Sequence, residues 1–344
     1  MSVFDCILKM MRQPASVAAE SLQSGEFRML VQRHRLLPQF AKALEAKGLE
    51  VDQELRGQLR RHAMKSMAIT AESVALFSRM KHLDGDLMVL KGPVLSCMLY
   101  GSPDQRQYND LDVYVKPDAF GEVLADLQQA GYRVSYPDMS KAFSLEYYFR
   151  YKHDIGLRHP ETGVYIELHR GINSRQLLPV GEEDALFACQ LRVPLPGGTV
   201  ASLDYTAQFI FLCIHGARHM FKRLIWLQDL AGFLPLAAER ADELPGLVRR
   251  FKLQRITGLC LVLLDELLEV PTPEEWAVFR SVRGVSVLRK LCVSGIAGPE
   301  EEELSAKWKR NLYFFLLKPG WSFGLHQLGS YFHRRRIRRQ FGGH

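Results

Sequence analysis

The chain has 344 residues, of which 47% are hydrophobic, 24% charged and 10% aromatic. This composition is that of a globular protein and excludes disordered, collagen-like and disulfide-scaffold proteins, and the length allows two or three domains of about 150 residues. The net charge of +7 comes from one end of the chain. Residues 304–344 carry nine basic and no acidic residues, which leaves 36 basic and 38 acidic residues in the remainder.

Cysteine usage and the absence of long apolar runs indicate where the protein resides. None of the six cysteines belongs to a C-x-x-C pair, so we expect buried free thiols in a reducing compartment. The first residues contain no apolar core of a signal peptide, and no run approaches the ~18 apolar residues that a membrane span requires. The sequence therefore predicts a soluble, cytoplasmic protein without a transmembrane segment.

Hydrophobic patterns divide the chain into four segments. Residues 1–83 show helical spacing, including an uninterrupted stretch over 58–82 that predicts a long helix. Residues 84–198 mix short β-type runs with helices, whereas residues 199–303 return to leucine-rich helical patterns. Residues 304–344 form a basic segment rich in aromatic residues. Within the second segment we predict strands at 87–90, 111–115, 155–159 and 164–169, and we interpret the Pro- and Gly-rich stretch 194–198 as a linker.

The first motif of the α/β segment joins a buried strand to a helix. Lys91 and Gly92 end the strand at 87–90, and Pro93 suits the first position of a helix because it has no N–H to leave unpaired. Gly101 is a suitable C-terminal residue for that helix. A helix start beside a lysine can bind an anion such as phosphate, although Lys-Gly before a helix is also common without any such function.

The second motif is the acidic pair Asp110 and Asp112 at the strand 111–115. Because side chains alternate along a strand, both aspartates should lie on one face and Leu111, Val113 and Val115 on the other. Two neighbouring carboxylates suit a hard divalent cation such as Mg²⁺. A solvated acidic face on an edge strand is the alternative interpretation of an isolated D-x-D.

Two further residues complete the set of candidates. Arg106 lies in the polar loop before Asp110, where it can contact either phosphate or a neighbouring carboxylate in a structural salt bridge. Glu167 lies on the strand 164–169, which forms a predicted hairpin with 155–159. It shares a face with Tyr165 and His169 and can complete a metal site that the aspartates begin.

The order of these motifs resembles the nucleotidyltransferase superfamily of the DNA polymerase β type. Within that superfamily, the motifs are most similar to those of the family labelled uncharacterised nucleotidyltransferase, and the similarity covers residues 84–232. It rests on Leu90-Lys91-Gly92, Leu99-Tyr100, Arg106, Asp110-Leu111-Asp112, Gly131-Tyr132, Glu167-Leu168-His169, and the series His215, His219, Arg223, Asp229. The sequence departs from the superfamily in having Lys91-Gly92-Pro93 in place of Gly-Ser, and Glu in place of the commoner Asp as third carboxylate.

The resemblance implies an α/β (α+β) fold: a polymerase β-like core with a mixed sheet, flanked by N- and C-terminal helical regions. It implies a metal-dependent enzyme of the EC 2.7.7 type that moves a nucleoside monophosphate from an NTP, such as ATP, to a hydroxyl acceptor. Asp110, Asp112 and Glu167 would hold Mg²⁺ or Mn²⁺ and be catalytic, and Lys91, Gly92 and Arg106 would bind the nucleotide. The resemblance leaves the acceptor open among a small molecule, a peptide and tRNA. The alternative is a catalytically inactive binding module that recognises nucleotide or RNA.

Two regions outside the core carry weaker signals. The residues His215, His219, Arg223 and Trp226 are spaced to share one face of a single helix. That face either packs on the α/β core or lines the active cleft. The tail 304–344 interleaves basic with aromatic residues, a mixture that suits RNA contact or an anionic membrane surface. Short basic chain ends are more often simply solvated.

Overall fold

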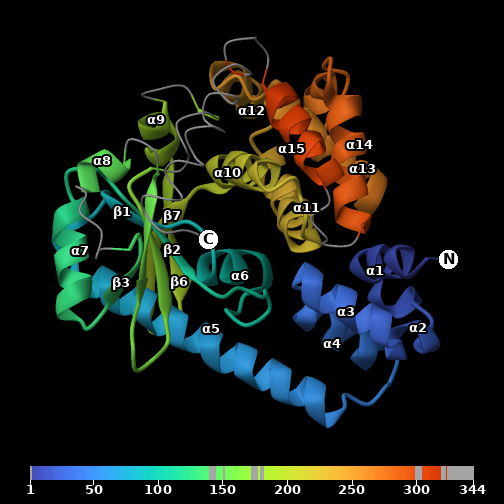
Figure 1. The fold of residues 1–344 in the computed structure, drawn as a ribbon, viewed down its shortest axis with the longest axis horizontal. Helices are drawn as coiled ribbons and strands as arrows, with labels where there is room; N and C mark the ends of the chain where they lie inside the picture. The colour runs from blue at the N-terminus through green and yellow to red at the C-terminus, as the bar shows by residue number, and fades with distance from the viewer. Residues whose placement is uncertain are drawn as a thin grey trace. The chain divides into compact units, whose positions relative to one another are not determined.

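The computed structural model describes residues 2–138, 145–149, 152–171, 177–178, 182–298, 304–318 and 323. These residues form two compact units (Figure 1). One unit contains the described residues from 2 to 62 and from 208 to 323, and the other contains those from 63 to 207. The sequence-based segments were divided at 83/84 and 198/199, so the observed α/β unit includes more chain on both sides.

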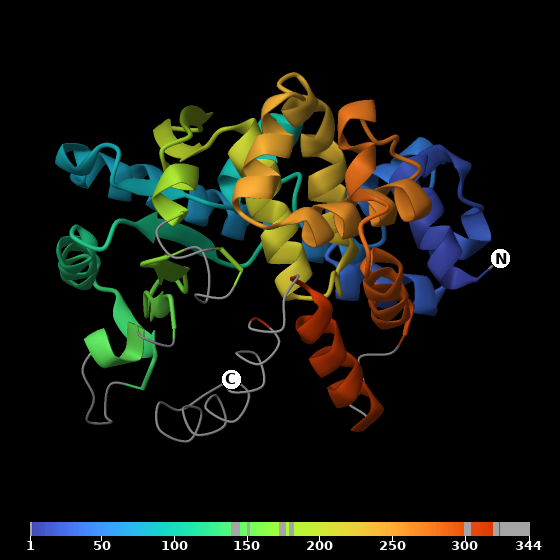
Figure 2. The same cartoon turned by 90° about the horizontal axis from the view of Figure 1, so that it is seen from above.

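The first unit is built from helices. Helix α13 lies at its centre, with ten buried residues in fifteen, and packs against α1, α11 and α14; Figure 2 shows α13 and α14 as neighbours. The helices of this unit are α1 (Val3–Arg12), α2 (Ala19–Gln23), α3 (Gly25–His34), α4 (Leu37–Ala46), the first part of α5 (Gln53–Arg79), most of α10 (Tyr205–Arg218), α11 (Leu224–Ala238), α12 (Glu243–Arg250), α13 (Gln254–Leu268), α14 (Val285–Ala297), α15 (Leu304–Leu316) and the 3₁₀ helices Pro14–Ser16 and Glu274–Phe279.

The second unit contains a mixed five-stranded sheet in the order β1-β2-β5-β4-β3. Strands β2 and β5 are parallel, and the other neighbouring pairs are antiparallel. Its elements are β1 (Leu87–Val89), α6 (Pro93–Tyr100), β2 (Leu111–Val115), α7 (Phe120–Gln129), β3 (Arg133–Tyr136), α8 (Leu145–Phe149), β4 (Asp154–Arg158), β5 (Tyr165–His169), α9 (Glu183–Phe187), β6 (Gln190–Leu195), β7 (Gly198–Leu203) and the 3₁₀ helix Lys81–Leu83. The predicted mixed α/β core is confirmed.

The central strands are buried on both faces. All five residues of β2 are buried, and Leu111, Val113 and Val115 are fully enclosed. Each predicted strand is present, and the predicted long helix is α5, 27 residues without an internal break. Strand β2 can be buried on both faces because helices can cover both sides of a sheet at its central strands.

The predicted linker at 194–198 is wrong. Strands β6 and β7 pair antiparallel from Gln190 with Leu203 to Leu195 with Gly198, so Pro196 and Gly197 form a two-residue hairpin turn. Gly197 has φ +93°, a backbone conformation that favours glycine. Pro194 lies within β6, which belongs to a two-stranded sheet where a missing N–H is tolerated.

Cysteines and helix lengths agree with the composition. All six cysteines are free thiols, as predicted, and four are buried (Cys6, Cys213, Cys260, Cys292). Within the described part of the chain, every helix is too short or too polar to cross a bilayer.

Candidate active site

The parallel pairing of β2 and β5 brings two acidic residues side by side. Asp112 lies directly opposite Glu167 in the register, between the pairs Leu111–Ile166 and Val113–Leu168. Residues paired in this way project on the same face of a sheet. Two carboxylates that are 55 residues apart in sequence therefore face a common space.

Asp112 is the most enclosed acid of this group, with a side chain 2% exposed. The Lys91 ammonium lies 2.8 Å from its Oδ1, and Nε2 of His169 lies 3.2 Å from the same oxygen. Burial alone would raise the pKa of Asp112, but the positive charge of Lys91 and the His169 hydrogen bond outweigh burial and lower it. Asp112 is therefore ionised and already forms an ion pair with the Lys91 ammonium.

Glu167 has the opposite electrostatic character. Burial and the neighbouring charge of Asp112 raise the pKa of Glu167 to about 7, against weaker opposing effects of His169 and Lys91. Oxygen atoms of Asp112 and Glu167 and a ring nitrogen of His169 lie within 4.8 Å of one another. A carboxylate pair at this distance resists full ionisation unless a cation is bound, and its oxygen atoms are suitable donors for a divalent ion.

The Lys91–Gly92 turn is shaped by glycine. Gly92 precedes α6 with φ +67° and ψ −124°, a conformation that residues with a side chain rarely adopt. A Cβ at this position would lie 3.3 Å from the Asp110 carbonyl oxygen and 3.5 Å from the Tyr108 ring. Pro93 occupies the first turn of α6, and Gly101 ends the helix with φ +74°, as predicted. Glycine thus allows Lys91 to turn toward Asp112.

Two other predicted site residues occupy different surroundings. Asp110 precedes β2, which begins at Leu111, so strand alternation does not set the direction of its side chain. It is half-buried and is not among the three residues that form the metal-ligand group. Arg106 is 4% exposed, and such burial favours the structural salt-bridge interpretation over open contact with phosphate. The metal role of Asp110 and the phosphate role of Arg106 stay predictions.

Sequence reasoning missed His153 and Asp154. Asp154 begins β4 and lies directly opposite His169 in the antiparallel register, and His153 immediately precedes it. Together the three residues form a second group whose potential ligand atoms lie within 4.8 Å. The only sequence signal was a His-Asp pair at the start of a predicted strand, and its partner could be identified only from the strand register.

The predicted single helix through His215 and Trp226 is wrong. Helix α10 ends at Arg218, and the backbone reverses through Met220 and Phe221, which have φ of 54° and 49°. The Phe221 N–H donates to the Gly216 carbonyl at 2.9 Å, and its ring packs where a Cβ of Gly216 would lie. Burial of this phenyl ring on a residue without a side chain accounts for the break.

The predicted cluster nevertheless forms in three dimensions. The ring centroid of His219 lies 4.9 Å from that of His215 and 5.0 Å from that of Trp226. The guanidinium carbon of Arg223 lies 5.7 Å from the Trp226 ring centroid. Each of the four side chains contacts at least one other within the first unit, which agrees with a role in packing.

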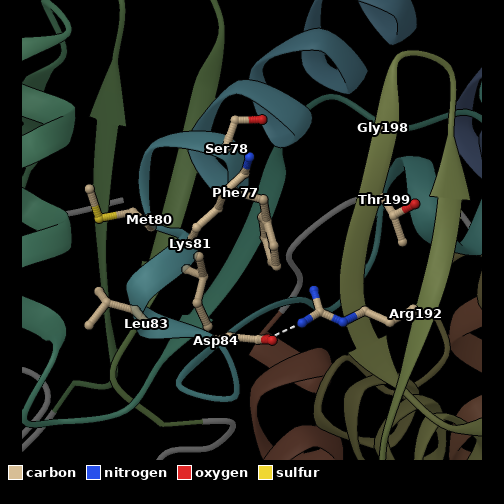
Figure 3. Close-up of a pocket in the computed structure, with 10 residues that line it drawn as sticks. Phe77, Ser78, Met80, Lys81, Leu83, Asp84, Arg192, Gly198 and Thr199 are labelled. Atoms are coloured by element: carbon tan, nitrogen blue, oxygen red, sulfur yellow. Dashed lines mark hydrogen bonds and ion pairs between the residues drawn. The ribbon is translucent and has the colours of Figure 1, made fainter.

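A pocket of roughly 320 Å³ lies elsewhere in the α/β unit (Figure 3). It is lined by the end of α5, the turn before β1 and the β6–β7 hairpin, and an ion pair between Arg192 and Asp84 crosses it. None of the residues around Asp112 lines this pocket. The Arg-rich part of the tail, 334–339, lies outside the described residues.

A family model described as uncharacterised nucleotidyltransferase matches residues 20–269. The chain belongs to this family. Its membership confirms the resemblance seen in the motifs and supports nucleotidyl transfer as the general reaction. Among solved structures, the chain is similar to an antigenic nucleotidyltransferase-like protein from Paracoccidioides brasiliensis, with 15% identity and a TM-score of 0.34 over 59% of this chain and 93% of that one. No curated protein matches the chain.

Proposed function

We propose that this protein transfers a nucleoside monophosphate from an NTP to a hydroxyl acceptor in a reaction that depends on a divalent cation. The observation that carries the proposal is the register of β2 and β5, which sets Asp112 against Glu167 on one face of a buried sheet. A buried carboxylate and a half-buried one rarely approach each other in this way unless they serve a cation or a proton transfer. The family assignment supplies the reaction class.

Asp112 and Glu167 would hold the cation, and Asp110 is the nearest further carboxylate along the chain. Oxygen donors of this kind favour Mg²⁺ or Mn²⁺. When bound, such an ion would neutralise charge on the triphosphate and favour departure of pyrophosphate.

Glu167 is also suited to be the base. With the cation bound, its carboxylate would be ionised, and an ionised carboxylate beside the acceptor hydroxyl can accept a proton. In the proposed step, the acceptor oxygen forms a bond to the α-phosphorus, and the bond from the α-phosphorus to the bridging oxygen of the β-phosphate breaks. Pyrophosphate leaves with that electron pair, and the acceptor proton passes to a carboxylate oxygen of Glu167.

Lys91 would change partners during nucleotide binding. Its ammonium is now held by Asp112 and is 14% exposed. Engagement of Asp112 by a cation weakens that ion pair, and phosphate oxygens become the better partner for the ammonium. Gly92, at the start of α6, keeps this turn free of a side chain, and Arg106 supports the adjoining loop.

A second candidate is the inactive binding module, which recognises nucleotide or RNA without turnover. Two observations favour it: Lys91-Gly92-Pro93 replaces Gly-Ser, and Lys91 already occupies the Asp112 carboxylate. Such a module would bind NTP and release it unchanged. The two candidates therefore differ in product and not in binding.

The test uses α-labelled ATP, CTP, GTP and UTP with Mg²⁺ or Mn²⁺, and three acceptor pools: the protein itself, tRNA, and small molecules and peptides from cell extract. We expect labelled product from the wild type and its loss in Asp112→Asn and Glu167→Gln. Asp118→Asn is the matched control, because Asp118 is an exposed acid that follows the same strand. Transfer by Asp112→Asn at the wild-type rate would reject the assignment. NTP binding without transfer would favour the inactive module.

Deletion of residues 330–344 separates the acceptor classes. That segment contains five arginines, and every ion pair with a phosphate that the deletion removes reduces the slope of log affinity against log salt by roughly 0.7–0.9. A smaller salt slope for tRNA binding in the deletion would favour a nucleic-acid acceptor. An unchanged slope would favour a small molecule or peptide.

A further inference from the structure

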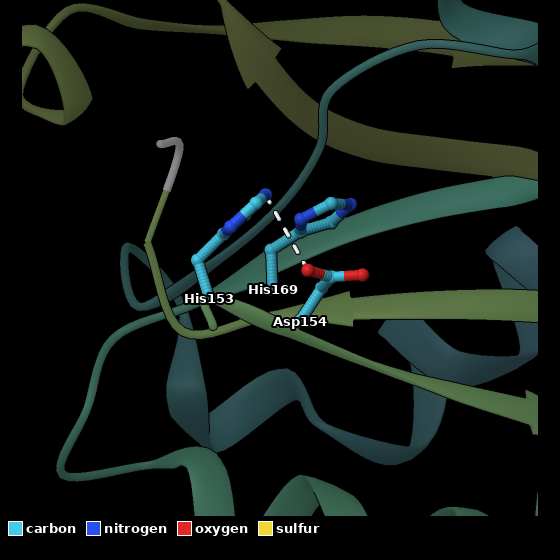
Figure 4. Close-up of side chains that lie close together, drawn as sticks. All are labelled: His153, Asp154 and His169. Atoms are coloured by element: carbon cyan, nitrogen blue, oxygen red, sulfur yellow. Dashed lines mark ion pairs between the residues drawn. The ribbon is translucent and has the colours of Figure 1, made fainter. Parts of the chain in front are cut away.

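The second group of potential ligands, His153, Asp154 and His169, lies at one end of the β4–β5 pair (Figure 4). Nε2 of His153 lies 3.4 Å from Oδ1 of Asp154. The ring of His169 stands beside this ion pair, with its centroid 5.6 Å from that of His153 and the two planes inclined by 24°. Two imidazoles and one carboxylate thus gather around a single point.

The backbone sets this arrangement. Asp154 and His169 are directly paired in the antiparallel ladder, so their side chains project from the same face. The Arg170 N–H donates to the His153 carbonyl at 2.7 Å, which extends the pairing by one residue and fixes the position of His153. The Tyr148 hydroxyl donates to the Asp154 carbonyl at 2.9 Å. The three side chains therefore start from a rigid frame.

The two ring nitrogens of His169 have different surroundings. Nε2 lies 3.2 Å from Oδ1 of Asp112 and is held by it. Nδ1 is buried, and among the residues that the structure describes it has no hydrogen-bond partner. His169 is only 5% exposed, so this nitrogen is also shielded from water. An unpaired nitrogen in such a place is costly unless a ligand satisfies it.

We propose that His153, Asp154 and Nδ1 of His169 form a second cation site, selective for a borderline metal ion of the Zn²⁺ or Co²⁺ kind. Two imidazole nitrogens and one carboxylate oxygen are the donors that such ions prefer over Mg²⁺, which favours oxygen. Three protein ligands also leave a coordination position open to water or substrate. This inference does not depend on nucleotidyl transfer.

Asp112 has a defined function in this arrangement. A histidine that binds metal through one nitrogen commonly donates its other N–H to a carboxylate, which fixes the tautomer and the ring orientation. Asp112 accepts from Nε2 of His169 in this way. The carboxylate of the proposed transfer site would therefore also position the ligand of the second site.

Metal binding without NTP tests the proposal. Protein treated with chelator is titrated with Co²⁺ and with Zn²⁺, and the visible spectrum of Co²⁺ and the heat of Zn²⁺ binding are recorded. We expect the His153→Gln and Asp154→Asn variants to lose at least tenfold in affinity, and Asp112→Asn to lose about 10–100-fold through the orientation of His169. The control His82→Gln removes an exposed histidine and should bind as the wild type does.

Nitrogen NMR spectra of protein with isotopically labelled histidine rings show which ring nitrogen binds the metal. Zn²⁺ should shift Nδ1 of His169, while Nε2 stays protonated. The proposal is overturned if Zn²⁺ shifts Nε2 instead, or if His153→Gln and Asp154→Asn bind the metal as tightly as the control. Far-UV circular dichroism of the metal-free variants verifies that they fold.

The outcomes of the two proposals are distinguishable. Loss of Zn²⁺ binding in His153→Gln with nucleotide transfer retained would support two separate sites. Loss of transfer in Glu167→Gln with unchanged Zn²⁺ binding would likewise support two separate sites. Absence of any transfer by the wild type would reject the proposed function and leave the metal titration valid.

Discussion

The ion pair between Lys91 and Asp112 makes a quantitative prediction. The substitution Lys91→Met keeps the length of the side chain but removes the ammonium from a carboxylate that is 2% exposed. Removing one partner of a buried ion pair costs about 3–5 kcal/mol, because the other charge is left in a poorly solvated place. We therefore expect the metal-free variant to lose about this much unfolding free energy.

A divalent cation should offset the loss. In Lys91→Met the cation no longer competes with the ammonium for Asp112, so Mn²⁺ should bind more tightly than in the wild type. At a hundredfold excess over its dissociation constant, a ligand stabilises the folded state by about 2.7 kcal/mol. The stabilising effect of Mn²⁺ should thus be larger in the variant.

The matched control is Lys116→Met. Lys116 forms the same kind of ion pair with Asp86 at 2.6 Å, but the two side chains are 45% and 38% exposed. An exposed pair contributes about 0–1 kcal/mol, so this variant should behave nearly as the wild type does with and without metal.

The assay must report on the α/β unit. The described tryptophans, Trp226, Trp276 and Trp308, lie outside that unit, so urea unfolding is followed by far-UV circular dichroism and by hydrogen exchange of peptides containing β2 and β5. The reasoning is refuted if Lys91→Met loses no more stability than Lys116→Met, or if Mn²⁺ stabilises both variants equally.

Two further predictions concern backbone shape and pH. Gly92→Ala should cost about 1–3 kcal/mol from the positive φ and reduce nucleotide transfer. The control Gly121→Ala, in open space on α7, should leave transfer unchanged and stabilise the protein by up to about 1 kcal/mol; equal denaturation curves for the two variants would contradict this. His34 is buried, accepts the Leu224 N–H at Nδ1, and has a pKa lowered from 6.5 to about 4, first by burial and then by the charge of Arg33. The unfolded chain takes up the proton first as pH falls, so stability present above pH 6.5 should decline by about 3 kcal/mol toward pH 4, and urea unfolding of His34→Asn should lack this decline; a parallel decline would refute it.

The strands of the α/β unit could be predicted because their signal is local. Alternating or continuous apolar runs bounded by Gly, Pro and Asp marked the segments that became β1, β2, β4 and β5, and the glycines at 92 and 101 marked the ends of α6. The hairpin of β6 and β7 escaped prediction because two prolines in a short stretch are typical of a linker. Only pairing with a partner strand shows that Pro194 is accommodated.

The break after α10 was missed for a different reason. Residues 219–223 contain neither Gly nor Pro, so helical spacing continues through them in the sequence. The chain reverses there because Phe221 is buried against Gly216, a contact that depends on tertiary packing. Helical periodicity reports which residues share a face only while the helix lasts.

The amino-acid sequence by itself determined the family, the buried strands and the acidic residues that project from them, because these depend on residue type and on spacing within a few positions. Tertiary structure alone decided which of these side chains meet. The register of β2, β5 and β4 places Glu167 opposite Asp112 and Asp154 opposite His169, and a shift of one residue would turn each side chain to the other face. Such pairing joins residues that are far apart along the chain, and local spacing contains no information about it.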